Sequence, residues 1–180
     1  IFMLDPLSIA LVRNHLDHTI SEIDKSSVGT MDMELVLDAF LNKLRQITGC
    51  STKDIFNMPI AIVISKADIK TLNSFIGEEV ISDYMAEHEM DMSMYMAAED
   101  TIIRKFLSDS GLANFVSNID LKFKNNRYFK CSAIGHTREH GRYNPKGVLD
   151  PMEWIFQTAD SGMKLVWNEN QFSNVKKGDK

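Results

Sequence analysis

The chain has 180 residues, of which 44% are hydrophobic, and its 20 Lys and Arg residues against 25 Asp and Glu residues give a formal net charge of −5. A chain of this length folds as one domain that buries roughly 70% of its unfolded surface, so it needs neither disulfides nor a structural metal. The longest apolar run, Ile60 to Ile64, is far shorter than the about 20 residues of a transmembrane helix. The acidic balance, with no Lys/Arg cluster before Lys176, argues against a nucleic-acid partner. We therefore expect a cytoplasmic protein without a membrane span.

The first residues predict a short buried strand. Ile1 to Leu4 is an apolar tetrad, and Asp5-Pro6 ends it because proline has no amide donor for regular pairing. The chain opens without a start methionine or a basic stretch, so we expect a fragment boundary here and no signal peptide. A weaker helical stretch is expected over 7–16, followed by a polar loop over 21–29.

A helix and a second strand follow. From Asp32 the apolar residues recur at spacings of three and four as far as Ile47, with Thr30 or Asp32 as the N-cap and Gly49 beyond the end. This pattern predicts an amphipathic helix. Ile60 to Ile64 is rich in β-branched residues without alternation, which is typical of a strand covered on both faces in a parallel sheet.

The second half predicts three helices and a third strand. Helices are expected over Tyr95 to Ser110 and Leu112 to Ile119, and a strand is expected over Tyr128 to Cys131. Because Cys131 lies in this apolar strand, we expect its thiol to be buried and inert. We expect the last helix to begin at Asp150, because Asp150 is a favourable N-cap, Pro151 suits the first helical position and Glu153 can complete a capping box. This helix is expected to stop near Gly162. The residues that this helix is expected to turn inward are Met152, Ile155, Phe156 and Ala159.

The order of these elements predicts the fold class. Strands that alternate with helices form right-handed crossovers, so we expect an α/β protein: a three-layer α/β sandwich on a short parallel sheet. Three strands are few, because the mean sheet has about five or six. We therefore expect further strands upstream of Ile1.

Two polar loops follow the second and third strands, where an open parallel sheet binds its ligands. They are Ser65-Lys66-Ala67-Asp68 and Ser132-Ala133. A carboxylate such as Asp68 can accept the N1–H and 2-amino hydrogens of guanine, the Lys66 stem can lie across the purine face, and the Ala133 N–H can donate to the 6-oxo group. Adenine would leave the buried carboxylate unpaired, at a cost of about 1–3 kcal/mol or more.

With these residues the sequence resembles the P-loop GTPases, which have Asn/Thr-Lys-x-Asp after one strand and Ser-Ala after the next. Asp5 at the end of the first strand is similar to an aspartate often found there. The pattern Pro145-x-Gly147-Val148-x-Asp150-Pro151-x-x-Trp154 resembles the end of bacterial double-GTPase-like domains. The resemblance covers residues 1–160. Ser65 departs from it, because the family has Asn or Thr at that position.

The resemblance implies the C-terminal half of a P-loop NTPase fold, with residues 1–162 as a partial GTPase-like domain and 163–180 as a tail. It implies guanine-binding roles for Ser65, Lys66, Asp68, Ser132 and Ala133. No Gly-x-x-x-x-Gly-Lys-Ser/Thr occurs in the sequence, so GTP or GDP with Mg²⁺ is expected in the complete domain and none tightly bound to this chain. The parent protein would hydrolyse GTP. This chain alone is expected to have no catalytic residues and no activity.

The alternative is a nucleotide-free, GTPase-like scaffold that acts as a protein-interaction module. Five of the 11 methionines, Met85, Met90, Met92, Met94 and Met96, form a segment suited to packing or docking more than to Cu(I). His136 and His140 flank Glu139, but the order is not His-Glu-x-x-His and no metal site is expected. The outer edge of the first strand, over residues 1–5, would pair with a second copy in a homodimer.

Overall fold

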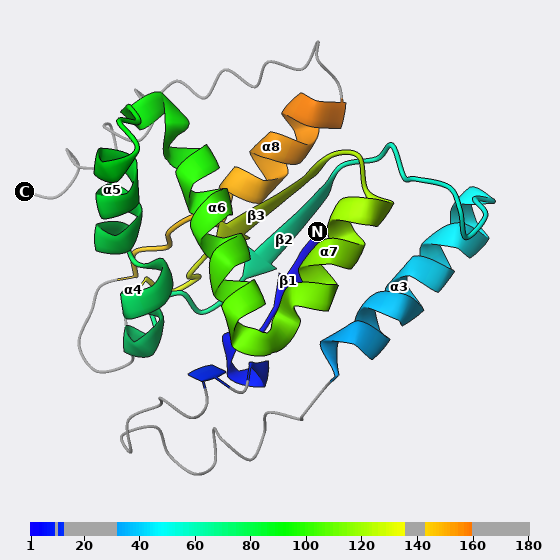
Figure 1. The fold of residues 1–180 in the computed structure, drawn as a ribbon, viewed down its shortest axis with the longest axis horizontal. Coiled ribbons are helices and arrows are strands. Elements are labelled where there is room, and N and C mark those ends of the chain that lie inside the picture. Colours follow the sequence, from blue (N-terminus) through cyan, green and yellow to red (C-terminus); the bar gives the residue numbers. More distant parts are fainter. Residues whose placement is uncertain (10, 13–31, 136–142, 160–180) are drawn as a thin grey trace, which may run out of the picture.

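The computed structural model describes residues 1–9, 11–12, 32–135 and 143–159 (Figure 1). Half of the segment 7–16, where a weak helix was expected, lies outside these residues, and Leu7 and Ser8 belong to a 3₁₀ turn. The polar loop, the His136–His140 pair and the tail also lie outside the described residues. The elements in chain order are strand β1 (Phe2–Leu4), the 3₁₀ turn η1 (Pro6–Ser8), α3 (Met33–Thr48), β2 (Ile60–Ile64), α4 (Lys70–Ile76), α5 (Glu78–Glu87), the 3₁₀ turn η2 (Met92–Met94), α6 (Tyr95–Leu107), the π-helical turn η3 (Ser108–Leu112), α7 (Ala113–Lys122), β3 (Asn126–Lys130) and α8 (Asp150–Ala159).

The strands form one open parallel sheet in the order β1-β2-β3. Ile62 stands in the middle, opposite Phe2 on one side and Tyr128 on the other. All five residues of β2 are buried, as an apolar run without alternation predicts. The three strands and their parallel pairing confirm the α/β class. Strand β3 begins two residues earlier than the sequence indicated and ends one residue earlier.

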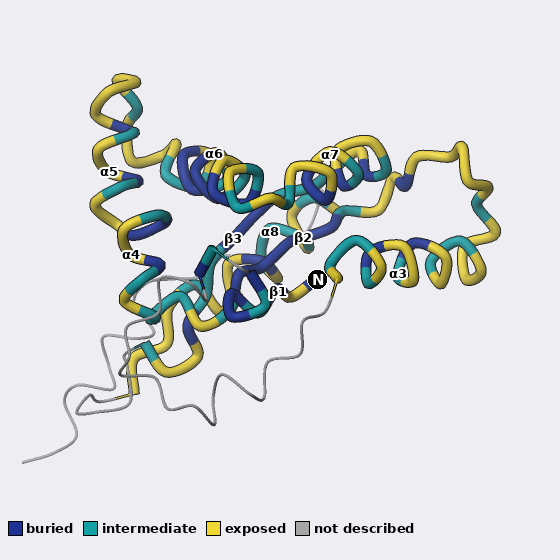
Figure 2. The backbone as a smooth tube through the Cα atoms, turned by 60° about the horizontal axis from the view of Figure 1, so that its bottom comes forward, coloured by how far each residue is buried: buried dark blue, intermediate teal, exposed yellow. Residues whose placement is uncertain are grey.

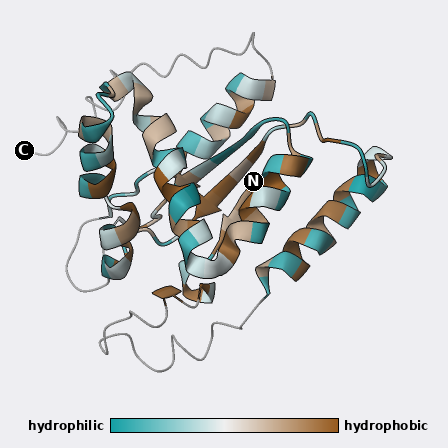
Figure 3. Ribbon diagram, viewed as in Figure 1, coloured by the Kyte–Doolittle hydropathy of each residue, from teal (hydrophilic) through white to brown (hydrophobic). Residues whose placement is uncertain are grey.

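Helices cover both faces of this sheet, because side chains alternate between the faces along each strand. The face of Phe2, Ile62 and Tyr128 packs in one large core with side chains of α3 to α7. The opposite face, with Ala61, Val63 and Phe129, packs against α8. Figure 2 shows the buried strands between these helices, and Figure 3 shows that β2 is hydrophobic along its length. Both faces of the sheet are therefore occupied at β2.

Helix α3 has the ends that its sequence predicts. The Asp32 side chain accepts a hydrogen bond from the Glu34 N–H, and Gly49 ends the helix in the left-handed conformation with φ of 71°. Phe40 meets Phe2 edge-on, with 5.5 Å between the ring centroids. This contact attaches the helix to the outer strand of the sheet.

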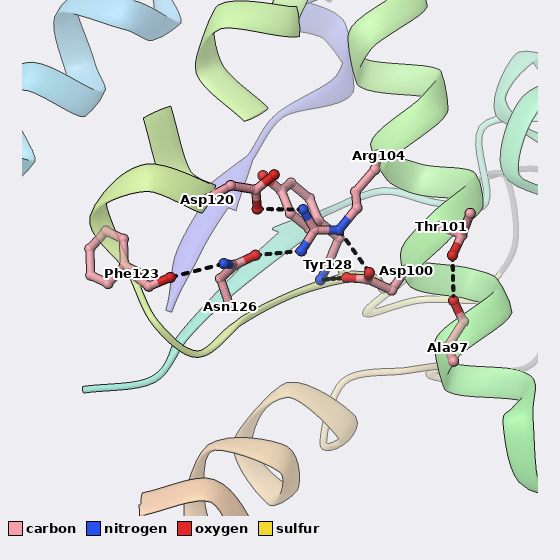
Figure 4. A network of polar contacts seen from close by, with 8 residues as sticks. All are labelled: Ala97, Asp100, Thr101, Arg104, Asp120, Phe123, Asn126 and Tyr128. Atoms are coloured by element: carbon pink, nitrogen blue, oxygen red, sulfur yellow. Dashed lines mark hydrogen bonds and ion pairs between the residues drawn. The ribbon is translucent and has the colours of Figure 1, made fainter. Parts of the chain in front are cut away.

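A cluster around Arg104 joins α6, α7 and β3 (Figure 4). The Arg104 guanidinium contacts Asp100 at 2.7 Å and Asp120 at 2.6 Å, donates to the Asn126 side chain, and lies 4.3 Å from the centroid of the Tyr128 ring. Asp100 in turn accepts a hydrogen bond of 2.7 Å from the Tyr128 N–H. A single side chain therefore fixes two helices against the edge of the sheet.

Two sequence predictions differ from the structure. The sequence indicated no helix between Ile64 and Tyr95, but residues 70–87 form α4 and α5, which meet at Gly77. In α8 only Ile155 of the four expected residues packs inward, since Met152 and Phe156 are 45% and 41% exposed and Ala159 is exposed. The contact stripe of α8 runs instead through Pro151, Trp154 and Ile155, and Trp154 lies 5.9 Å from Phe129 between ring centroids. The other three positions point to an adjacent side of the helix, which the sheet does not reach.

Candidate functional site

The loop after β2 is held by the ends of both neighbouring strands. The Ser65 N–H and Oγ both donate to the Leu4 carbonyl, at 2.9 and 3.0 Å, and the Ala67 N–H donates to the Cys131 carbonyl at 2.9 Å. Between these anchors Lys66 adopts the left-handed conformation with φ of 54°, which is uncommon for a residue other than glycine. The loop is therefore fixed at the carboxyl edge of the sheet, and its strained residue is one of the expected site residues.

Lys66 forms an ion pair with Asp5 at the end of β1. The Nζ–Oδ2 distance is 2.8 Å, and the two side chains are 51% and 39% exposed. The other Asp5 oxygen accepts a hydrogen bond of 3.0 Å from the Leu7 N–H, which begins the η1 turn. An exposed pair of this kind contributes at most about 1 kcal/mol. The lysine stem can therefore move onto a ligand at little cost.

Asp68 is joined to the loop after β3 through Ser132. The Ser132 Oγ donates to Asp68 Oδ1 at 2.5 Å and accepts a hydrogen bond of 2.8 Å from the Gly135 N–H. Ser132 is buried, at 3% exposure, and its backbone pairs in antiparallel fashion with Lys146. No group in the described part of the chain donates to Asp68 Oδ2. One oxygen of this half-buried carboxylate is therefore oriented by the protein and the other remains able to accept.

Ala133 follows Ser132 and is exposed. Its N–H donates to no oxygen within residues 1–9, 11–12, 32–135 and 143–159. The structure thus brings the loops of Asp68 and Ala133 together through one serine, and offers a carboxylate acceptor and a backbone donor on neighbouring loops. Lys66 lies on the same loop as Asp68, beside Asp5. All five expected site residues are located at this edge of the sheet.

Two glycines also shape the site; the sequence analysis named Gly147 only in the pattern before the last helix and did not select Gly135. Gly135 has φ of 82°, and a Cβ built there would lie 1.6 Å from the Asn144 carbonyl oxygen. Gly147 has φ of 63°, and its Cβ would lie 2.4 Å from the Lys130 carbonyl oxygen. Each position therefore admits glycine alone without a backbone shift. The signal available in the sequence was the spacing Ser132-x-x-Gly135.

Beside these loops lies a pocket of about 520 Å³. Asp68 and Ser132 contribute to its wall, whereas Lys66 and Ala133 do not. Beyond Asp68 the pocket extends to α5, α6 and the start of α8, and the most buried carboxylate of its lining is Glu99, which is only 6% exposed. The pocket therefore lies beside the expected base site and shares Asp68 and Ser132 with it.

Other expected features are located as follows. Cys131 was expected to be buried within the third strand, but it follows the end of β3 and is only partly buried. This partial burial raises the pKa of its thiol. Met85 is buried in α5, while Met92 and Met94 are 77% and 45% exposed on the η2 turn. Within the described residues no three His, Cys, Asp or Glu side chains gather as they would around a metal ion. Among the helices described, none combines the length and apolarity needed to cross a bilayer.

No protein-family model matches the sequence, and neither a curated protein nor a solved structure matches the chain.

Proposed function

We propose that the chain binds the guanine base of a nucleotide at the loops that follow β2 and β3. The Asp68 carboxylate accepts the N1–H and the adjacent 2-amino hydrogen, the Ala133 N–H donates to the 6-oxo oxygen, and the Lys66 stem lies on the purine face. The observation that carries the proposal is the bond from Ser132 to Asp68 Oδ1, which orients the carboxylate while its second oxygen has no described donor. This arrangement selects guanine, because adenine has no donor at N1.

The wider proposal is that the chain supplies the guanine-binding portion of a GTPase-like switch or NTPase domain. The parallel sheet with helices on both faces is compatible with this role, and the loops lie at the carboxyl ends of the strands. The sequence has no phosphate-binding Gly-x-x-x-x-Gly-Lys-Ser/Thr loop. We therefore propose that phosphate and Mg²⁺ contacts come from another part of a complete domain, and that the 180 residues alone do not hydrolyse GTP.

A nucleotide titration followed by amide NMR tests the base site. Base contacts alone give weak affinity, on the order of millimolar, so GTP should shift the amide resonances of Asp68 and Ala133 at that concentration. ATP should leave them unchanged. Asp68→Asn replaces an acceptor with an amide donor, which opposes guanine N1–H and suits the 2-oxo group of xanthine, so the preference should move from GTP towards XTP.

The matched control is Asp83→Asn, which makes the same chemical change on an exposed position of α5. This variant should bind GTP like the unmodified chain. If Asp68→Asn keeps full GTP affinity and gains none for XTP, Asp68 does not read the base. Magnesium-dependent GTP hydrolysis by a clean preparation of the 180 residues would contradict the wider proposal.

The second candidate function is a nucleotide-free scaffold that binds another protein. The exposure of Met92 and Met94 favours it, because flexible thioether side chains adapt to varied partners. It predicts that neither GTP nor XTP shifts the amides of Asp68 and Ala133. The same titration therefore separates the two functions.

A further inference from the structure

The pocket beside Asp68 has the size of a small-molecule site. Its volume of about 520 Å³ lies within the roughly 300–1,000 Å³ of typical ligand pockets. Its wall comes from α4 and α5, the start of α6, the end of β3 and the start of α8, together with the loops after β2, after β3 and before α8. The helices and the strand of this wall are held in place by the core.

Glu99 is the buried charged group of this wall for which no described residue supplies a partner. It is 6% exposed, lines the pocket, and makes no hydrogen bond to any described residue. Lys70, Lys146 and Asp150, which also line the pocket, are exposed to solvent, whereas Glu78 and Lys130 are paired. Glu78 binds Lys130 at 3.0 Å and accepts from the Tyr95 hydroxyl at 2.5 Å, and the Lys130 ammonium also donates to the Ile76 carbonyl. A buried carboxylate without a donor is unfavourable, so a donor from a ligand would stabilise it.

The surroundings of Glu99 decide its charge. Burial raises its pKa to about 7, and Lys130 from β3 opposes this shift, while Asp150 from α8, Glu78 from α5 and Asp100 from α6 add to it. The carboxyl group is thus about half ionised at neutral pH. A bound cation would lower its pKa and hold it in the ionised form.

We propose that this pocket binds a small organic molecule with a protonated primary amine, whose ammonium donates to the Glu99 carboxylate. An ammonium supplies the donor that buried Glu99 lacks, whereas Lys70 and Lys146, the lysines that line the pocket apart from Lys130, are exposed and can pair with ions from solvent. Lys130 already has a carboxylate and a carbonyl as acceptors. The Ile76 and Tyr95 side chains offer apolar surface for the carbon part of the ligand. This site lies beyond the proposed base site and does not depend on it.

The test uses benzylamine and benzyl alcohol, which have similar shapes and differ in charge. In an amide NMR titration at pH 8 without nucleotide, benzylamine should shift the resonances of pocket residues with saturation in the millimolar range. Benzyl alcohol should bind at least about tenfold more weakly, since it brings no charge to Glu99. Glu99→Gln should weaken benzylamine binding by a similar factor, and Glu79→Gln, an exposed neighbour outside the pocket, should leave it unchanged.

The pH dependence gives a second readout. Benzylamine stays protonated between pH 8 and pH 6, whereas Glu99 gains its proton, so affinity should fall roughly tenfold over this range. Glu99→Gln should remove the dependence. Equal binding of amine and alcohol, unchanged binding in Glu99→Gln, or no saturable shift of pocket resonances would each overturn the proposal. Because no nucleotide is present, the result stands apart from that of the guanine titration.

Discussion

The Ser132 hydroxyl donates to the Asp68 carboxylate across 2.5 Å, although the two residues stand 64 positions apart in the chain. The bond links the loop after β2 to the loop after β3. Because the Gly135 N–H donates to the same hydroxyl oxygen, the hydroxyl hydrogen is free to point at Asp68. The rotamer of Asp68 is therefore set by a buried residue and not by solvent.

Ser132→Ala should weaken guanine binding without unfolding the chain. The change removes the donor to Asp68 Oδ1 and the acceptor of the Gly135 N–H, so the carboxylate loses its orientation. We expect a loss of about 1–2 kcal/mol in GTP binding, or roughly 5- to 30-fold, measured by NMR titration. Ser74→Ala, which removes an exposed hydroxyl from α4, is the control. Full GTP affinity in Ser132→Ala would show that this bond does not prepare the site.

Arg104→Ala should destabilise the fold strongly. The arginine side chain is 24% exposed and contacts Asp100 and Asp120, so its removal leaves two carboxylates without their cation. Breaking a buried pair costs about 3–5 kcal/mol, and because the Asp120 side chain is 47% exposed we expect a loss of about 2–4 kcal/mol here. Urea denaturation followed by circular dichroism measures this loss. Lys105→Ala removes the same charge from the exposed neighbour and should change the free energy of unfolding by less than about 0.5 kcal/mol. Equal effects of the two variants would contradict the role given to Arg104.

Glu99→Gln should stabilise the chain at alkaline pH and not at acid pH. The folded state raises the pKa of Glu99 from 4.5 to about 7, so the folded state binds its proton more tightly than the unfolded state. In the unmodified chain stability therefore falls between pH 4.5 and pH 7, by about 3 kcal/mol at 1.36 kcal/mol per pKa unit. The glutamine variant lacks this loss. Its advantage in urea denaturation should be near zero at pH 4.5 and largest at pH 8, and an advantage independent of pH would refute the assignment.

Met3→Lys should reduce self-association. Met3 is 60% exposed on β1, whose outer edge pairs with no other strand of the described residues. An open apolar edge favours pairing with a second copy, and a charge on an edge strand opposes it. Sedimentation velocity should show a dimer for the unmodified chain and a shift to monomer for the variant. Met58→Lys, at another exposed methionine, should remain dimeric. A stable monomer of the unmodified chain would rule out pairing through this edge.

The strands and α3 could be predicted because their signals are local. Ile60 to Ile64 is apolar at every position, and α3 carries its cap at Asp32 and its stop at Gly49. Helices α4 and α5 could not be recognised in the same way. Their buried residues are few and Gly77 interrupts the spacing, so the pattern resembles a loop. Contacts with α6 bury the few apolar residues that each short helix carries.

The candidate base site was predictable in its residues but not in its geometry. Lys66, Asp68 and Ser132 stand directly after strands, so their meeting at one edge follows from the parallel order. The bond between Asp68 and Ser132, and the strained backbone of Lys66, depend on loop packing that a single sequence does not reveal. Nothing in the sequence indicated that Glu99 is buried. A glutamate in an amphipathic helix is normally on the solvent side, whereas Glu99 is 6% exposed and faces the pocket that it shares with Lys130 of β3 and Asp150 of α8.

The bend at Gly111 has a consequence for the order in which the chain folds. Its φ of 88° lets α7 turn back beside α6, so Arg104 reaches Asp120 and Asn126 after only 16 and 22 residues. The bonds between Leu4 and Ser65, in contrast, close a separation of 61 residues. Shorter loops close at lower entropic cost, and contacts of small separation form faster. We expect residues 95–130 to form the early structure in refolding, and pulsed hydrogen exchange should protect β3 before β1 joins the sheet.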